Sequence, residues 1–243
     1  MPEVFRFSPL LVVAAVAAEV RDAFPTWAQL PTETLPIGRL ASLEPHVSIL
    51  LTGVGIIRAA AAAAYVLGRR RFAALLHIGV GGAYPGAPVQ VGDLATAAGE
   101  CDPQSGIITP AGYQDLGGLG FPLTDAFPNS LMFNSPWADW VAQQVAPAPR
   151  LLFATVACCS GTDAAAAAMA ARTTAAVENM EGLAVAWTAA QFGVPYAALR
   201  AISNFTGDRE RQQWNLPAAC AALARGLKAI LDALPVESDQ DCS

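Results

Sequence analysis

The chain has 243 residues, of which 54% are hydrophobic and 14% are charged. This composition argues against an intrinsically disordered protein and provides enough apolar surface for one large domain. The formal net charge is −6, and the cations are 13 arginines and one lysine. Because neutralising phosphates requires clustered Lys and Arg, we expect no nucleic-acid partner.

Short apolar runs alternate with helical patterns along the chain. The expected strands, in chain order, cover residues 10–18, 47–52, 73–79, 94–99, 151–157, 173–179 and 196–204. The expected helices cover residues 19–30, 57–69, 137–145, 163–172, 183–192 and 214–233. Residues 101–136 hold five prolines and break the pattern, which is typical of a binding loop. We expect one α/β domain over residues 1–235, with a mixed, largely parallel sheet, and a frayed acidic tail over residues 236–243.

The sequence favours a cytoplasmic protein with no membrane partner. A membrane span needs about 18 or more consecutive apolar residues, and no stretch reaches that length. The apolar run at residues 10–18 lacks the cleavage site of a signal peptide. The five cysteines are an odd number, which is typical of reduced thiols in the cytoplasm.

Neither a metal nor a cofactor is expected. The two histidines and the adjacent Cys158 and Cys159 lack the spacing of metal ligands. Two glycine clusters, Gly53–Gly55 and Gly79–Gly82, follow expected strands, but neither completes the Gly-x-Gly-x-x-Gly fingerprint of dinucleotide-binding proteins. The clusters indicate only that the backbone turns tightly or approaches another group closely.

Charged side chains stand at two expected strand ends. The run Glu178–Gly182 contains two carboxylates where a strand gives way to a helix, a place where ligands bind in open α/β sheets. The same run also fits an exposed acidic first helical turn. Arg200 lies inside an apolar strand and needs a carboxylate partner, for which Glu19, at the end of the first strand, is the candidate. That pair fits either a structural ion pair or a site.

Five motifs in order resemble the purine nucleoside phosphorylase/nucleosidase superfamily over about residues 8–233. They are Thr52–Gly55, Gly79–Gly82, Gly92–Leu94, Asn179–Gly182 and Arg200–Asn204. The resemblance is nearest to the futalosine hydrolases of menaquinone biosynthesis, beside the 5′-methylthioadenosine/S-adenosylhomocysteine nucleosidases. It implies a single-domain nucleoside phosphorylase-like fold, in which helices flank a central mixed, partly barrel-like sheet. It also implies a homo-oligomer, dimeric or higher, with sites near the subunit interfaces.

The resemblance also implies roles for single residues. Glu19 would hold and deprotonate the attacking water, and Arg200 would orient the glutamate or the water. Glu181 would bind the ribose 2′- and 3′-hydroxyls, with Met180 packed beneath the sugar. The other residues expected to bind the substrate are Asn179, Gly81 and Ser203.

Asn204 stands where adenine-specific nucleosidases carry aspartate. An aspartic acid can protonate N7 of adenine, whereas an amide offers donors and an acceptor without a transferable proton. Asn204 would therefore favour a 6-oxopurine base. The implied reaction is hydrolysis of the N-ribosidic bond of futalosine, which releases hypoxanthine and needs no cofactor.

Several departures from the superfamily bear on this expectation. His77 and Val80 replace the arginine and hydroxyl residue that hold phosphate in phosphorylases, which favours water as the nucleophile. Arg58 follows the first glycine cluster and could reach an anion such as the substrate's carboxylate. Ala164 falls where related enzymes stack an aromatic ring on the base, and the possible replacements are Phe205, Phe133 and Trp214. A nucleosidase for methylthioadenosine or another purine nucleoside, and a non-catalytic nucleoside-binding or storage protein, stay open as alternatives.

Overall fold

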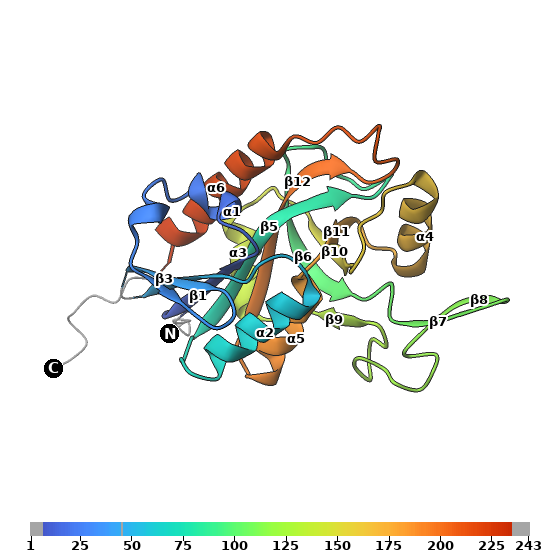
Figure 1. Cartoon of the computed structure of the whole chain (residues 1–243), viewed down its shortest axis with the longest axis horizontal. Helices are drawn as coiled ribbons and strands as arrows, with labels where there is room; N and C mark the ends of the chain where they lie inside the picture. The colour runs from blue at the N-terminus through green and yellow to red at the C-terminus, as the bar shows by residue number, and fades with distance from the viewer. Residues whose placement is uncertain (1–6, 45, 235–243) are drawn as a thin grey trace.

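The computed structural model describes residues 7–44 and 46–234, and its strands form one long mixed sheet and a small hairpin (Figure 1). The strands are β1 (Leu10–Ala14), β2 (Thr32–Thr34), β3 (Arg39–Glu44), β4 (Val47–Leu51), β5 (Ala74–Ala83), β6 (Leu94–Cys101), β7 (Gly106–Thr109), β8 (Gly112–Asp115), β9 (Ser130–Met132), β10 (Arg150–Thr155), β11 (Val177–Asn179) and β12 (Tyr196–Phe205). The helices are α1 (Ala18–Arg21), α2 (Ile56–Leu67), α3 (Pro136–Gln144), α4 (Asp163–Thr173), α5 (Gly182–Gln191) and α6 (Leu216–Asp232). The expected tail over residues 236–243 lies outside the described residues.

The long sheet has the order β11-β10-β6-β12-β5-β1-β4-β3-β2, and β9 pairs with β6. An additional antiparallel pairing of β11 with β5 closes five strands into a ring. β5 lies parallel to β1 and β12, whereas β12 and β6 are antiparallel. The expected mixed, partly barrel-like sheet is confirmed.

Helices cover both sides of this sheet. α2 and α5 lie together on one side, and α1 and α6 lie on the other (Figure 1). α2 buries Ala59, Ala62 and Ala63, and the helix that it mainly contacts is α5. Side chains at three helix starts accept the first free backbone N–H groups, and these caps are Ser135 for α3, Thr162 for α4 and Asn215 for α6.

The expected helix over residues 19–30 is wrong for most of its length. α1 ends at Arg21, and only a short 3₁₀ turn follows at Trp27–Gln29. Pro25 lacks the N–H that would continue a helix at this point. The expected strand over residues 10–18 likewise ends early, at Ala14, because the chain turns before α1. The edge strand β2 and its neighbour β3 carry weak apolar patterns and were not predicted.

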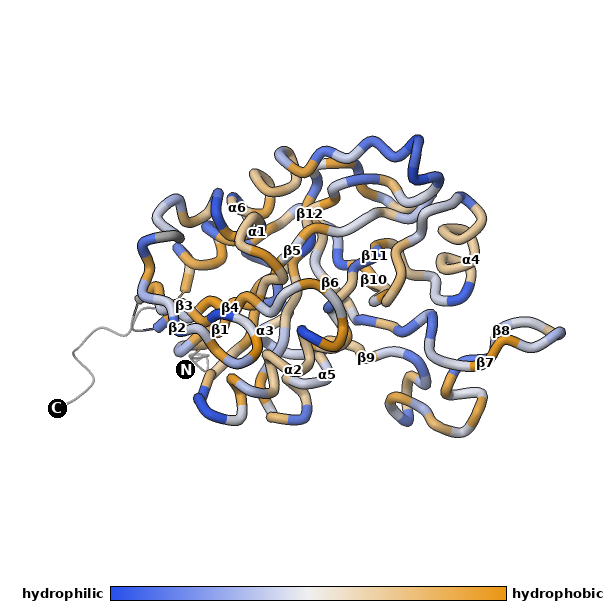
Figure 2. The backbone as a smooth tube through the Cα atoms, viewed as in Figure 1, coloured by the Kyte–Doolittle hydropathy of each residue, from blue (hydrophilic) through white to orange (hydrophobic). Residues whose placement is uncertain are grey.

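The expected binding loop over residues 101–136 instead forms β7, β8 and the edge strand β9. β7 and β8 pair only with each other and extend from the body as an arm (Figure 1). Figure 2 shows hydrophobic residues on β7, where Ile107 and Ile108 are exposed. Within residues 7–44 and 46–234, no helix is long and apolar enough to cross a membrane.

β5 runs through the second glycine cluster rather than ending before it. A β-carbon on Gly79 would lie 2.8 Å from Glu19 Oε1, and one on Gly81 would lie 2.7 Å from Val177 Cγ1. Real β-carbons do not approach other atoms so closely, so these positions require glycine for space rather than for a turn. The cluster therefore lets α1 and β11 approach β5.

Gly81→Ala should lower the free energy of unfolding by about 1–3 kcal/mol, because its β-carbon would overpack Val177 and lie 3.1 Å from the Glu178 carbonyl oxygen. Gly161→Ala is the matched control, since no atom lies within 4 Å of its β-carbon. We expect the control to change stability by less than about 0.5 kcal/mol. Urea denaturation measures both, and equal effects would contradict the close-approach argument.

Candidate active site

A cavity of about 510 Å³ opens where β1, β5, β11 and β12 end, and its volume suits a small organic ligand. Of the eight predicted site residues, seven line it: Glu19, Gly81, Asn179, Met180, Glu181, Ser203 and Asn204. The eighth, Arg200, is buried behind the wall. The fold therefore brings together segments that are up to 185 positions apart in the sequence (Glu19 to Asn204).

The Glu19 carboxylate is held entirely by backbone donors. Oε2 accepts hydrogen bonds from the N–H groups of Ala15 (2.9 Å) and Val16 (3.1 Å), and Oε1 accepts one from Val80 (3.1 Å). Burial raises the pKa of Glu19, and the Val16 and Val80 donors and the Arg200 charge oppose that shift. The site thus holds a fixed carboxylate with raised basicity, which suits a general base.

Arg200 does not form the expected ion pair with Glu19; no such pair occurs in the described part of the chain. Both side chains flank Gly79, whose missing β-carbon would lie 2.8 Å from Glu19 Oε1 and 3.4 Å from Arg200 Nη1. Glu19 turns instead to backbone donors, and Arg200 Nη2 lies 3.2 Å from both ring nitrogens of His77. Burial, and then the Arg200 charge, lower the pKa of His77, so its ring is neutral at neutral pH.

Asn179 is engaged by the protein at both ends of its amide. Oδ1 accepts from the N–H groups of Glu181 (3.0 Å) and Gly182 (2.6 Å), just before and at the start of α5. Nδ2 donates to Glu100 Oε2 at 3.0 Å. Asn179 therefore fixes the backbone that carries Glu181, and its contact with a ligand stays a prediction.

Glu100 is a buried acid that the sequence analysis missed. Its Oε2 also accepts from Thr155 Oγ1 at 2.8 Å, while Oε1 has no partner among the described residues. A β-carbon at Gly182 would overlap this carboxylate, so α5 starts here only because residue 182 is glycine. Burial raises the pKa of Glu100, which favours a protonated acid. A charged residue inside the apolar run 94–101 was the available signal.

Glu181 joins the first glycine cluster to the cavity. Its Oε1 accepts a hydrogen bond from the Gly55 N–H at 2.7 Å. Gly55 has a φ of 101°, a conformation that favours glycine, and precedes α2. This conformation directs the Gly55 N–H to the Glu181 carboxylate, which lies 126 positions later in the sequence.

The Asn204 amide is oriented by its neighbours. Oδ1 lies 2.8 Å from Ser203 Oγ, which donates to it. Nδ2 donates to the Phe205 carbonyl oxygen at 3.1 Å and to Gln212 Oε1 at 3.4 Å. Gln212 Nε2 in turn donates to the Ser160 carbonyl oxygen at 3.0 Å. Gln212 was not predicted, because it lies in a polar loop without regular structure.

Glu178 holds the part of the cavity wall that contains Ser160. Its Oε1 accepts from the Ser160 N–H at 2.9 Å, and its Oε2 accepts from Ser160 Oγ at 2.6 Å and from the Tyr84 hydroxyl at 3.0 Å. Burial, with the Glu178 charge, raises the pKa of Tyr84, so the phenol keeps the proton that it donates. The acidic run at the end of β11 is therefore buried rather than an exposed helical turn.

Of the three aromatic residues proposed to stack on a base, only Trp214 lines this cavity. Phe133 is buried against Tyr196, with ring centroids 4.7 Å apart. Phe205 lines a second cavity of about 710 Å³ across the loop over residues 206–215. No residue of 101–136 lines the cavity of about 510 Å³, although Gln104 braces its wall by accepting from the Ala157 N–H at 2.6 Å.

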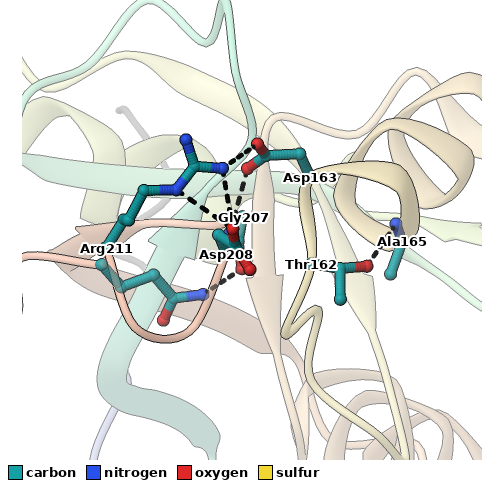
Figure 3. Close-up of polar contacts among 7 residues, drawn as sticks. Thr162, Asp163, Ala165, Gly207, Asp208 and Arg211 are labelled. Atoms are coloured by element: carbon teal, nitrogen blue, oxygen red, sulfur yellow. Dashed lines mark hydrogen bonds and ion pairs between the residues drawn. The ribbon is translucent and has the colours of Figure 1, made fainter.

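The loop between β12 and α6 is fastened to the start of α4. Arg211 Nη2 lies 2.6 Å from Asp163 Oδ2 and 2.8 Å from Asp208 Oδ2, and the Asp208 N–H donates to Asp163 Oδ1 at 2.9 Å (Figure 3). These ion pairs are exposed and contribute little stability singly, but together they set the position of the loop. Within the described ranges, no group of three or more His, Cys, Asp or Glu side chains could hold a metal ion.

Comparisons with known proteins identify the family of the chain. Residues 8–232 match the family model described as the phosphorylase superfamily. A futalosine hydrolase of Streptomyces coelicolor is 36% identical over 223 residues, which covers 88% of this chain and 91% of that protein. A futalosine hydrolase of Thermus thermophilus is 33% identical over 185 residues, covering 75% of this chain and 80% of that protein.

Solved structures show the same fold. A 5′-methylthioadenosine/S-adenosylhomocysteine nucleosidase of Colwellia psychrerythraea, in complex with adenine, has a TM-score of 0.76 at 20% identity and covers 96% of this chain and 99% of that one. The futalosine hydrolase of Helicobacter pylori has a TM-score of 0.77 at 16% identity, covering 93% and 97%. The chain therefore belongs to the phosphorylase superfamily and, within it, to the family of the futalosine hydrolases.

Proposed function

We propose that this protein hydrolyses the N-ribosidic bond of futalosine, releasing hypoxanthine and dehypoxanthine futalosine. Its place among the futalosine hydrolases supports the reaction. The single structural observation that carries the proposal is the cavity in which the Glu19 carboxylate and the Asn204 amide come together. No cofactor enters the reaction, because water attack on an oxocarbenium-like sugar needs only a positioned base and a departing group.

Glu19 is the base in this scheme. Three backbone donors hold both of its oxygens, and the remaining lone pairs are available to a water in the cavity. The carboxylate accepts a proton as the water oxygen bonds to the anomeric carbon and the C–N bond breaks. Arg200 acts from behind the wall, where its charge opposes the rise in the pKa of Glu19 that burial causes.

Glu181 and Met180 hold the sugar. The Glu181 oxygen that is free of Gly55 accepts from the ribose hydroxyls, and Met180 supplies an apolar contact beside it. Gly81 lines the cavity, and Asn179 supports the Glu181 backbone. These contacts position the anomeric carbon against the water.

Asn204 recognises the base. Ser203 donates to Oδ1, and Nδ2 donates to the Phe205 carbonyl oxygen at 3.1 Å and to Gln212 Oε1 at 3.4 Å, so the longer contact with Gln212 is the one that a base would replace. A 6-oxopurine presents acceptors at O6 and N7, which match an amide donor. The donor stabilises the negative charge that develops on departing hypoxanthine, without a proton transfer.

Water rather than phosphate is the nucleophile. Glu19, Glu178 and Glu181 line the cavity, and Arg209 is the one cation among its described lining residues. A phosphate dianion beside three carboxylates would be repelled in a site of low dielectric. The alternative, a nucleosidase for methylthioadenosine, is related by fold, and the amide at position 204 disfavours it.

We also propose a cytoplasmic homo-oligomer in which residues 1–235 act as one domain. The four described cysteines are free thiols, as in reducing compartments. Exposed Ile108 and Phe121, on and beside the arm, suit burial against another copy.

Incubating the purified protein with futalosine, inosine, methylthioadenosine and adenosine, each with and without phosphate, tests the function. We expect free hypoxanthine from futalosine at a rate independent of phosphate. Preference for methylthioadenosine would favour the alternative nucleosidase. Release of no free base from any substrate would favour the non-catalytic binding protein.

Glu19→Gln should lower kcat about 10²–10⁴-fold, because the amide cannot accept the proton from water. Hypoxanthine binding, measured by calorimetry, should survive, since Glu19 faces the sugar rather than the base. Near-normal turnover of futalosine by this variant would remove Glu19 from the mechanism.

The pH profile of kcat/KM should show an acid limb that belongs to Glu19. Burial raises its pKa above the ordinary 4.5, and the base must be ionised, so activity falls as pH drops through that raised value. Glu19 and Glu100 affect the stability of the fold in the opposite direction. Because their pKa values are raised in the folded state, the folded state binds these protons more tightly, and the contribution of both groups to the free energy of unfolding falls as pH rises. Unfolding therefore does not explain the limb. An acid limb that persists unchanged in Glu19→Gln would assign it to another group.

Asn204→Asp should reduce kcat on futalosine about a hundredfold near neutral pH, equivalent to about 3 kcal/mol, because an ionised carboxylate faces the acceptors O6 and N7. When protonated, the aspartic acid can donate to N7 of adenine, so relative activity on adenosine should rise at acidic pH. We would compare kcat/KM for both substrates in wild type and variant. An unchanged ratio would show that residue 204 does not touch the base.

A further inference from the structure

The charges around the cavity are unbalanced. Three carboxylates line it, whereas Arg209 is the only cation among the described lining residues. A ligand that carries its own carboxylate would meet net repulsion everywhere except beside that guanidinium. The position of Arg209 therefore decides where an anionic part of a ligand can lie.

Arg209 and Arg211 belong to the same loop but differ in their partners. Arg211 forms ion pairs with Asp163 and Asp208 (Figure 3). Arg209 is exposed, forms no ion pair with any described carboxylate, and has its guanidinium carbon 4.8 Å from the centre of the Trp214 ring. Its backbone N–H donates to the Gly161 carbonyl oxygen at 2.9 Å, which anchors it to the cavity wall. The N–H edges of a guanidinium stacked on indole stay free to bind an anion.

Three apolar residues of the cavity lining are exposed, and one of them, Trp214, lies against Arg209. Trp214, Val54 and Val16 line the cavity and are 43%, 49% and 40% exposed. Exposed apolar side chains in the lining of a pocket that also carries one cation suit an aromatic group that ends in a carboxylate.

We propose that Arg209 and these three apolar residues form the subsite for an aryl carboxylate attached to the 5′ end of the nucleoside. Arg209 binds the carboxylate through its fork of N–H donors, and Trp214, Val54 and Val16 contact the ring. The inference rests on the proposed function, because futalosine carries such a tail on a hypoxanthine nucleoside. It makes Arg209 the residue that distinguishes futalosine from nucleosides with a neutral 5′ end.

Arg58, which the sequence suggested as a partner for the substrate's carboxylate, lies outside the cavity lining. It is exposed on α2, and its stem folds back on Gly53, where a β-carbon would lie 3.0 Å from Arg58 Cδ. It is not among the described residues that line the cavity. Arg58 is therefore a matched control: an exposed arginine of the same charge, outside the proposed subsite.

The test compares futalosine with its methyl ester, which keeps the base, the sugar and the ring but removes the charge. In Arg209→Met, which keeps the length and apolar stem of the side chain, kcat/KM for futalosine should fall about 10- to 100-fold, mainly through KM, as expected for one lost charge-assisted contact. The methyl ester should change by less than about threefold. Arg58→Met should leave both substrates unchanged.

Several outcomes would overturn the proposal. If Arg209→Met lowers kcat/KM equally for futalosine and its methyl ester, Arg209 supports the loop rather than binding the carboxylate. If only Arg58→Met lowers kcat/KM selectively for futalosine, the carboxylate binds at α2 instead. Unchanged kcat/KM for futalosine in Arg209→Met, with an active wild type, contradicts this inference and leaves the proposed function standing. A wild type that releases no hypoxanthine from futalosine contradicts both.

Discussion

β5 crosses the centre of the sheet with glycine at positions 79, 81 and 82, and neighbouring side chains fill the space that β-carbons would occupy. Glu19 lies against Gly79, and Val177 lies against Gly81. Because β5 also pairs with β1, β12 and β11, its close approaches determine how near α1 and β11 come to each other. A bulkier β5 would hold the carboxylates of the site apart.

The site holds more buried charge than a core normally tolerates, and backbone donors make this possible. Glu19 accepts hydrogen bonds from backbone N–H groups, and Glu178 accepts them from a backbone N–H and from side chains. Burial raises the pKa of Glu100, which favours its protonated form. Among the described residues, the buried side-chain atoms that lack a hydrogen-bond partner are Thr96 Oγ1, Glu100 Oε1 and Arg200 Nε.

The sequence predicted most central elements because buried strands and Ala-rich helices have strong local patterns. It failed at residues 19–30, where the predicted helix runs through Pro25, and at the edge strand β2 and its neighbour β3. It also treated Gly79–Gly82 as the end of a strand, since glycine is ordinarily a breaker. Only the neighbours of these glycines show that they continue β5.

For the site, the motifs alone determined which residue types are present: a glutamate after the first strand, the acidic run after β11 and an asparagine at the end of β12. The tertiary structure decided their relations. It separated Arg200 from direct contact with Glu19, placed Glu100 behind Asn179 and brought Gln212 to Asn204. Trp214, among three aromatic candidates, became the one at the cavity. Local sequence patterns encode periodicity and propensity, whereas contacts between residues more than a hundred positions apart depend on strand order and on the space that missing side chains leave.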